Sequence, residues 1–120
     1  MATEIGHRLA DLSDGIDSQG KPSFTTRLRE SSWQISSILA EGSACPTKAE
    51  FAVFVGRARG ATLEIANLVI FFGQRELITE AEEVDIINML KRESKMLDNF
   101  RQSLERAEER TDTTSAAVVA

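Results

Sequence analysis

Few residues of this 120-residue chain have types and spacings that could support catalysis or metal binding. Glu4-Ile5-Gly6-His7 is an E-x-x-H string, which on a bundle helix can ligate one iron of a di-metal site. Such a site needs two strings, and His7 is the only histidine of the chain. A single histidine also gives no Ser/His/Asp or Cys/His set for nucleophilic catalysis. We therefore predict no metal, no cofactor and no catalytic residue, and interpret His7 as solvated or helix-packing.

A second group of polar residues consists of Arg29, Glu41 and Glu64. Glu64 lies in a mostly apolar stretch, where a carboxylate needs a cationic or hydrogen-bonding partner. We predict a structural role: Arg29 contacts a carboxylate and fixes the helix register or a contact between subunits. A catalytic acid–base pair is the alternative, but no pocket motif accompanies these residues.

Basic residues in the second half of the chain raise the question of nucleic-acid binding. The candidate contacts are Lys91, Arg92, Lys95 and Arg101. Acidic residues interleave with them: Glu93, Asp98, Glu105, Glu108 and Glu109. This mixture favours a solvated helix, and a net charge of −5 disfavours a general binder of phosphate backbones. Nucleic acid is therefore a disfavoured partner.

The composition indicates one soluble, helical domain. The chain has two prolines, no tyrosine, 42% hydrophobic and 28% charged residues. Cys45 is the only cysteine, so an internal disulfide framework is excluded and a cytoplasmic location is expected. The N-terminal residues do not resemble a secretory signal, and no apolar run reaches the length of a membrane span.

Apolar periodicity predicts helices over about 3–16, 23–42, 47–73 and 79–109. Thr47 with Glu50, and Thr79 with Glu82, have the spacing of capping boxes. Gly42 suits a left-handed position after the second helix. Short connectors between these helices predict an all-α, antiparallel up-down four-helix bundle over residues 1–110. Residues 111–120 lack periodicity and are expected to form a flexible tail.

The predicted helix over 47–73 has more apolar residues than a single core can bury. We assign one set to the core of the bundle: Phe51, Phe54, Ala58, Ile65 and Phe72. A second stripe is left for a neighbouring subunit: Val53, Gly56, Gly60, Leu63 and Ile70. The two glycines, four residues apart, leave bare backbone where another helix could approach closely.

The second and third predicted helices contain a motif that is similar to that of a known family. It comprises Arg29, Leu39-Ala40-Glu41-Gly42, Thr47, Glu50-Phe51, Phe54-Val55, Ala58, Gly60-Ala61 and Glu64. The pattern resembles the bacterial four-helix-bundle proteins that include products of 23S rRNA intervening sequences. The resemblance implies a homopentamer around a central axis. Related accessory proteins of diversity-generating retroelements bind nucleic acid through basic surfaces, together with a reverse transcriptase. The loop at 43–46 is neutral here, where the family usually has basic residues.

These observations lead to a non-enzymatic, self-assembling scaffold or interaction protein whose partner is a further copy of itself, as a homopentamer. The alternative is a nucleic-acid-binding accessory factor, and an enzyme comes third. The sequence identifies neither a small-molecule substrate nor a membrane partner.

Overall fold

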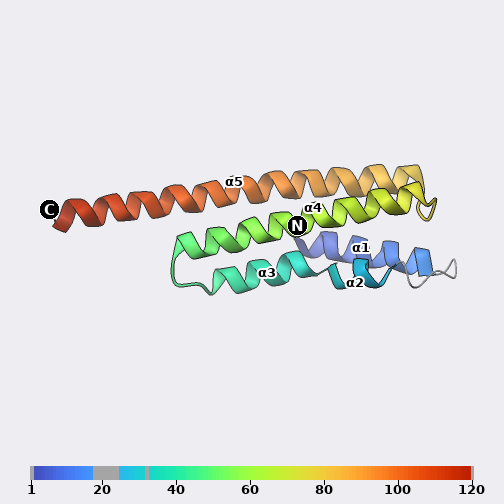
Figure 1. Ribbon diagram of the computed structural model, residues 1–120, viewed down its shortest axis with the longest axis horizontal. Coiled ribbons are helices and arrows are strands. Elements are labelled where there is room, and N and C mark those ends of the chain that lie inside the picture. Colours follow the sequence, from blue (N-terminus) through green and yellow to red (C-terminus); the bar gives the residue numbers. More distant parts are fainter. Residues whose placement is uncertain (1, 18–24, 32, 120) are drawn as a thin grey trace.

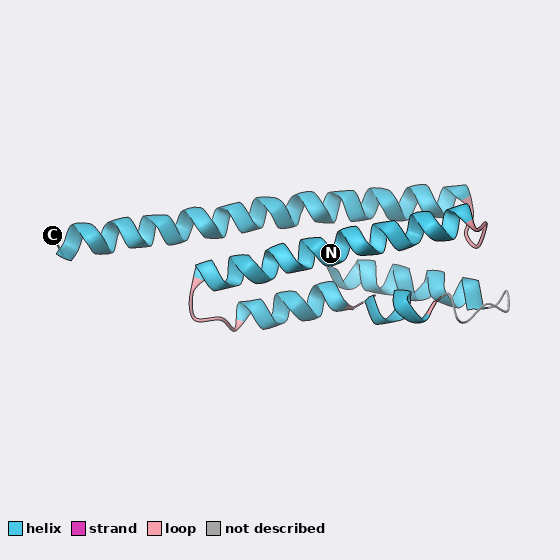
Figure 2. Cartoon of the chain, viewed as in Figure 1, coloured by secondary structure: helices cyan, strands magenta, loops and turns pink. Residues whose placement is uncertain are grey.

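The computed structural model describes residues 2–17, 25–31 and 33–119. These residues form α1 (Ala2–Asp17), α2 (Thr26–Ser31), α3 (Gln34–Ser43), α4 (Lys48–Gln74) and α5 (Glu80–Val119), with no strand among them. The all-α prediction is confirmed. The chain direction reverses between α1 and α2, between α3 and α4, and between α4 and α5, as expected for an up-down helical bundle (Figures 1 and 2). None of the described helices has an apolar stretch long enough to cross a membrane.

Local hydrogen bonds fix the starts of the two long helices. Thr47 precedes α4, and its Oγ1 accepts a hydrogen bond from the Glu50 backbone N–H at 3.1 Å. Before α5, Glu82 N–H donates to Thr79 Oγ1 at 3.1 Å, and Thr79 N–H donates to Glu82 Oε1 at 2.8 Å. Both starts were predicted, because a capping box depends only on residues three apart.

The core lies along one face of α4, and the prediction for this face was partly wrong. Ala58, Ile65 and Phe72 are buried as expected, but Phe51 and Phe54 are only half-buried at the edge of the core. The remaining apolar residues that α4 buries are Ala52, Val55, Ala61 and Val69. Both rings lie beside Gly42 of α3 and remain partly exposed there. Phe51 packs edge-to-face on Phe100, with ring centroids 5.3 Å apart.

The helix predicted over 23–42 is wrong as one element, because its described part is divided into α2 and α3. The predicted start at Ser23 lies outside the described residues. Trp33 precedes α3 with φ −115° and ψ 0°, outside helical geometry. Ser36 Oγ donates to Trp33 O at 3.0 Å. Serine hydroxyls that bond nearby backbone carbonyls compete with helix formation, and this segment is rich in serine.

The last helix is longer than predicted. α5 continues to Val119 rather than ending at 109, so the structure has helix where a flexible tail was expected. No glycine or proline follows Gly73, so the sequence contains no strong helix breaker. A helix of 40 residues spans ~60 Å, close to the 66 Å long axis of the molecule. Its far end extends beyond the loop between α3 and α4 (Figure 1).

Candidate interaction surface on α4 and α5

The outer face of α4 carries the residues predicted to contact another subunit. Val53, Leu63 and Ile70 are 63%, 52% and 42% exposed. Gly60 is open: a Cβ added there would meet no atom within 4 Å. A Cβ on Gly56 would lie 3.6 Å from Arg101 Cδ, so α5 covers part of that position. The face is therefore apolar and accessible in the single chain, and its use as an interface stays a prediction.

A groove of about 400 Å³ runs between this face and α5; we call it the α4–α5 groove. Its lining comprises Arg59, Thr62, Leu63, Ala66, Ile70, Ile87, Leu90, Lys91, Ser94, Lys95 and Asp98. Thr62 is buried, and its hydroxyl donates to Ala58 O at 2.9 Å. Arg59 Nε donates to Ser94 Oγ at 3.2 Å and links the two helices. With these polar groups paired, the groove presents mainly aliphatic side chains.

The rim of the groove is basic. Lys91 and Lys95 are exposed, and neither forms an ion pair with any other described residue. Arg101 instead donates to Asp98 at 2.7 Å and to Glu105 at 2.9 Å. The hydrogen bond from Arg101 holds the pKa of Asp98 below its usual value. Of the four predicted nucleic-acid contacts, Lys91 and Lys95 therefore lie together at this rim. Arg101 is paired with carboxylates, and Arg92 lies outside the groove.

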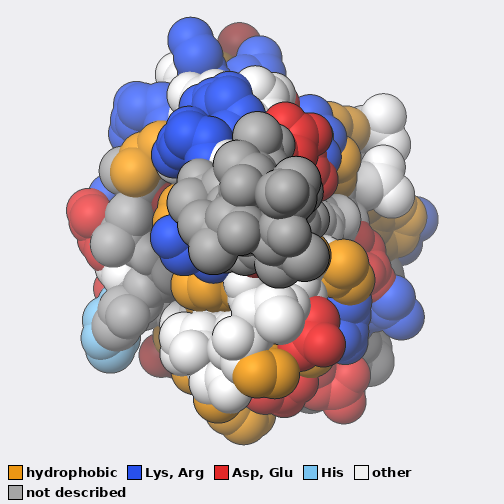
Figure 3. All heavy atoms as spheres, turned by 90° about the vertical axis from the view of Figure 1, so that its left-hand side faces the viewer, with side chains coloured by type: hydrophobic (Ala, Val, Ile, Leu, Met, Phe, Trp, Pro, Cys, Tyr) orange, Lys and Arg blue, Asp and Glu red, His pale blue; other side chains and the backbone are white. Residues whose placement is uncertain are grey.

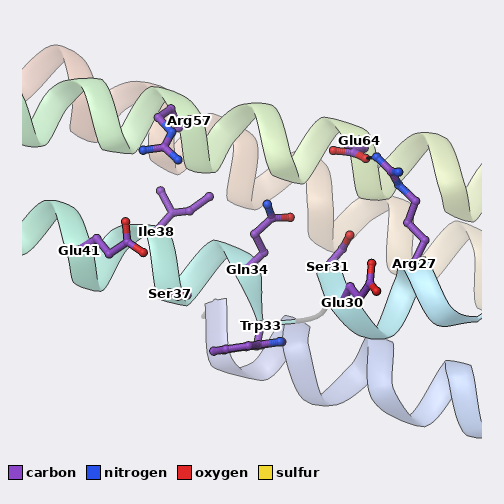
Figure 4. A pocket seen from close by; sticks show the side chains of 10 residues that line it. All are labelled: Arg27, Glu30, Ser31, Trp33, Gln34, Ser37, Ile38, Glu41, Arg57 and Glu64. Carbon is purple, nitrogen blue, oxygen red and sulfur yellow. Dashed lines mark hydrogen bonds and ion pairs between the residues drawn. The ribbon is translucent and has the colours of Figure 1, made fainter.

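A second, polar groove of about 410 Å³ lies between α4 and the α2–α3 pair (Figure 4). It is lined by Arg27, Glu30, Ser31, Trp33, Gln34, Ser37, Ile38, Glu41, Arg57 and Glu64. Glu64 forms an ion pair with Arg27 across it. Arg57 lies over the ring of Phe54, 4.9 Å from its centroid.

Arg29 contacts a carboxylate, as predicted, but the carboxylate is neither Glu41 nor Glu64. Arg29 binds Asp14 of α1 at 3.0 Å, whereas Glu64 pairs with Arg27. Residues two apart on a helix are separated by ~200° around its axis, so Arg27 can face α4 while Arg29 faces α1. Glu41 lies exposed farther along the polar groove. The structure thus brings Glu41 and Glu64 to one groove, but not Arg29 with either.

The candidate metal-binding and nucleophilic residues do not gather in a site. Glu4 and His7 are both exposed on α1. Cys45 is half-buried, with Sγ 3.8 Å from Glu41 O, to which it donates. Among the described residues, no three His, Cys, Asp or Glu side chains lie close enough together to hold a metal ion.

Glu93 is a feature that the sequence interpretation missed. It was expected on a solvated face, but it is only 4% exposed. Burial raises the pKa of its carboxyl group above the usual value. The burial could have been predicted from the apolar repeat of α5. Ile86, Leu90, Glu93 and Leu97 lie four, three and four residues apart, so Glu93 occupies a core position of this helix.

Comparison with known proteins identifies the family. A model of the family described as 23S rRNA-intervening sequence protein matches residues 1–99, which include the residues lining both grooves. No curated protein and no solved structure matches the chain. On the strength of the family match, this chain belongs to the 23S rRNA-intervening sequence protein family.

Proposed function

We propose that this protein is a non-enzymatic scaffold of the cytoplasm that assembles with itself, as a homopentamer, through the outer face of α4. The observation that carries the proposal is the apolar stripe of Val53, Leu63 and Ile70, which is exposed in the single chain. Phe71, 42% exposed, extends this stripe toward the end of α4. Apolar side chains grouped on one face are typical of surfaces that bind another protein. Gly60 leaves bare backbone within the stripe, which permits a neighbouring helix to approach closely.

Light scattering coupled to size-exclusion chromatography tests this proposal. We expect the wild-type protein to elute with five times the mass of one chain. Leu63→Glu places a charge in the proposed contact and should shift the protein to the monomer. Met96→Glu is the matched control, because Met96 is also 52% exposed but lies on α5 outside the groove. A monomeric wild-type protein would contradict the proposal.

The second candidate function is that of a nucleic-acid-binding accessory factor, and Lys91 and Lys95 favour it. Both ammonium groups project at the same rim, where they could contact phosphates. A mobility-shift assay at low and moderate salt distinguishes the two functions. If the protein is an accessory factor, it should bind RNA or DNA, and this binding should weaken as the salt concentration rises. The Lys91→Glu/Lys95→Glu variant should not bind. The scaffold function predicts no shift at either salt concentration.

A further inference from the structure

Trp33 is the most exposed large hydrophobic residue of the described chain, at 66%. It lies at the start of α3, and Figure 4 shows its indole pointing away from α4. Tryptophan is enriched at protein interfaces, where its large ring becomes buried. The position of Trp33 therefore indicates a contact that the single chain does not make.

The residues around Trp33 give this surface an acidic character. Trp33, Ser37 and Glu41 follow one another at four-residue spacing along α3, and Glu30 precedes them on α2. Within the described part of the chain, Glu30 and Glu41 have no ion-pair partner. We call these four residues the α3 edge. It presents one large aromatic ring and two carboxylates. Two arginines line the same polar groove: Arg27 is paired with Glu64, and Arg57 lies over the ring of Phe54.

The α4–α5 groove has the complementary properties. Leu63, Ile70 and Ile87 supply aliphatic walls, and Lys91 and Lys95 supply ammonium groups at the rim. Viewed along the bundle, a group of Lys and Arg side chains lies at the top, on the α5 side (Figure 3). The two surfaces therefore differ in charge, and a volume of about 400 Å³ can accept an aromatic side chain.

We propose that the α3 edge of one copy docks into the α4–α5 groove of the next copy, with Trp33 against Leu63 and Ile70. Glu30 and Glu41 then face Lys91 and Lys95. The occupant is a second copy because this chain carries both complementary surfaces. They lie on different sides of α4, so one subunit can use both at once. Such a contact is head-to-tail, the type that produces a closed ring when the rotation between successive subunits closes. This inference rests on the proposed self-assembly and specifies its contact.

Charge reversal on either surface tests the pairing. Lys91→Glu/Lys95→Glu makes both surfaces acidic, and Glu30→Lys/Glu41→Lys makes both basic, so each double variant should be monomeric. The quadruple variant exchanges the charges and should recover the wild-type mass. Arg92→Glu/Arg106→Glu is a control of equal charge change at exposed residues outside the groove, and should leave the assembly intact. Double variants that retain the wild-type mass overturn the inference.

Mixing the two double variants adds a geometric test. Two copies of the same variant repel each other, because their grooves and α3 edges have the same charge. Each subunit can therefore bind only the other variant, so the two must alternate. A strictly alternating ring has an even number of subunits and cannot close with five. We expect native mass spectrometry to find equimolar, even-numbered assemblies and no five-membered ring. Five-membered rings with random subunit ratios would overturn the head-to-tail pairing.

Trp33 is the only tryptophan of the chain, so its fluorescence reports on this contact without any substitution. In the assembled wild-type protein we expect a blue-shifted emission and several-fold weaker quenching by acrylamide than in the Lys91→Glu/Lys95→Glu variant. A wild-type assembly with fully quenchable Trp33 overturns the docking contact but leaves the scaffold function standing. A monomeric wild-type protein removes the scaffold function and the docking contact together.

Discussion

Gly42 of α3 lies so close to Phe54 of α4 that no side chain fits between them. A Cβ on Gly42 would be 2.6 Å from Phe54 Cβ and 2.9 Å from Phe51 Cδ1. Gly42 is an internal residue of α3 and is buried. The left-handed position expected from the sequence is therefore wrong, because α3 continues to Ser43 and Gly42 has no positive φ. What position 42 requires is the absence of a side chain.

Gly42→Ala is therefore predicted to lower the free energy of unfolding by ~1–3 kcal/mol, the usual cost of overpacking a core. The Cβ meets Phe54 Cβ, which is bonded to the backbone of α4 and cannot rotate away, so the two helices must separate. Urea denaturation followed by circular dichroism measures the change. Gly60→Ala in the monomeric Leu63→Glu background is the control. That position is open and helical, so alanine should add up to ~1 kcal/mol there. Equal effects at both positions would show that the close contact is absent.

The features that were predicted from the sequence depend on residues near one another in the chain. Thr47 and Thr79 cap helices through residues three positions later, and Ile65 and Phe72 lie on the same helical face. The periodicity of α4 led to the assignment of Phe54 to the core, whereas its neighbour Val55 is the residue that is fully buried. That choice depends on how closely α3 approaches, which Gly42 determines from another helix.

The pairing of charged residues could not be predicted for a related reason. Arg27 and Glu64 are 37 positions apart, and Arg27 rather than Arg29 reaches Glu64 because its side of α2 faces α4. The two grooves are likewise spaces between helices rather than motifs in one. Exposure of the α4 stripe was foreseen because it follows from having more apolar residues than one core accepts.

The ion pair between Arg27 and Glu64 should contribute little to stability. Both side chains are substantially exposed, so water screens their attraction. A double-mutant cycle with Arg27→Ala and Glu64→Gln should give a coupling energy of ~0.2–1 kcal/mol. A parallel cycle with Arg29→Ala and Glu64→Gln should give none, because Arg29 binds Asp14. Stronger coupling in the second cycle would restore the pairing expected from the sequence.

The end of α4 contains a strained position that substitution should relieve. Glu76 has φ 58°, and the surrounding bonds form a Schellman motif: Leu77 N–H donates to Phe72 O and Glu76 N–H to Gly73 O, both at 3.0 Å. Glycine adopts this left-handed conformation without a steric cost. Glu76→Gly should therefore raise the free energy of unfolding by ~1 kcal/mol. Gln74→Gly, inside the last turn of α4, should lower it by a similar amount. If both glycines destabilise equally, position 76 is not left-handed in solution.

Burial of Glu93 should make the stability of the protein depend on pH. Its pKa is raised in the folded state, so the folded protein binds the proton more tightly than the unfolded chain does. The contribution of Glu93 protonation to the free energy of unfolding is therefore largest below pH 4.5, the ordinary pKa of the carboxyl group in an unfolded chain. This contribution is lost as the pH rises through the higher pKa of the folded state. Glu93→Gln removes the buried charge and should be more stable than wild type at pH 7, with the difference vanishing near pH 4.

Melting temperatures measured by circular dichroism from pH 4 to pH 8 check this prediction. Glu109→Gln serves as the control, because Glu109 is exposed on the same helix and its replacement should not change the pH profile relative to wild type. Because Gln and protonated Glu have similar size and polarity, packing differences between the variant and the wild type should be small at low pH. A Glu93→Gln profile that parallels wild type at every pH would mean that the carboxyl group reaches water in the folded protein.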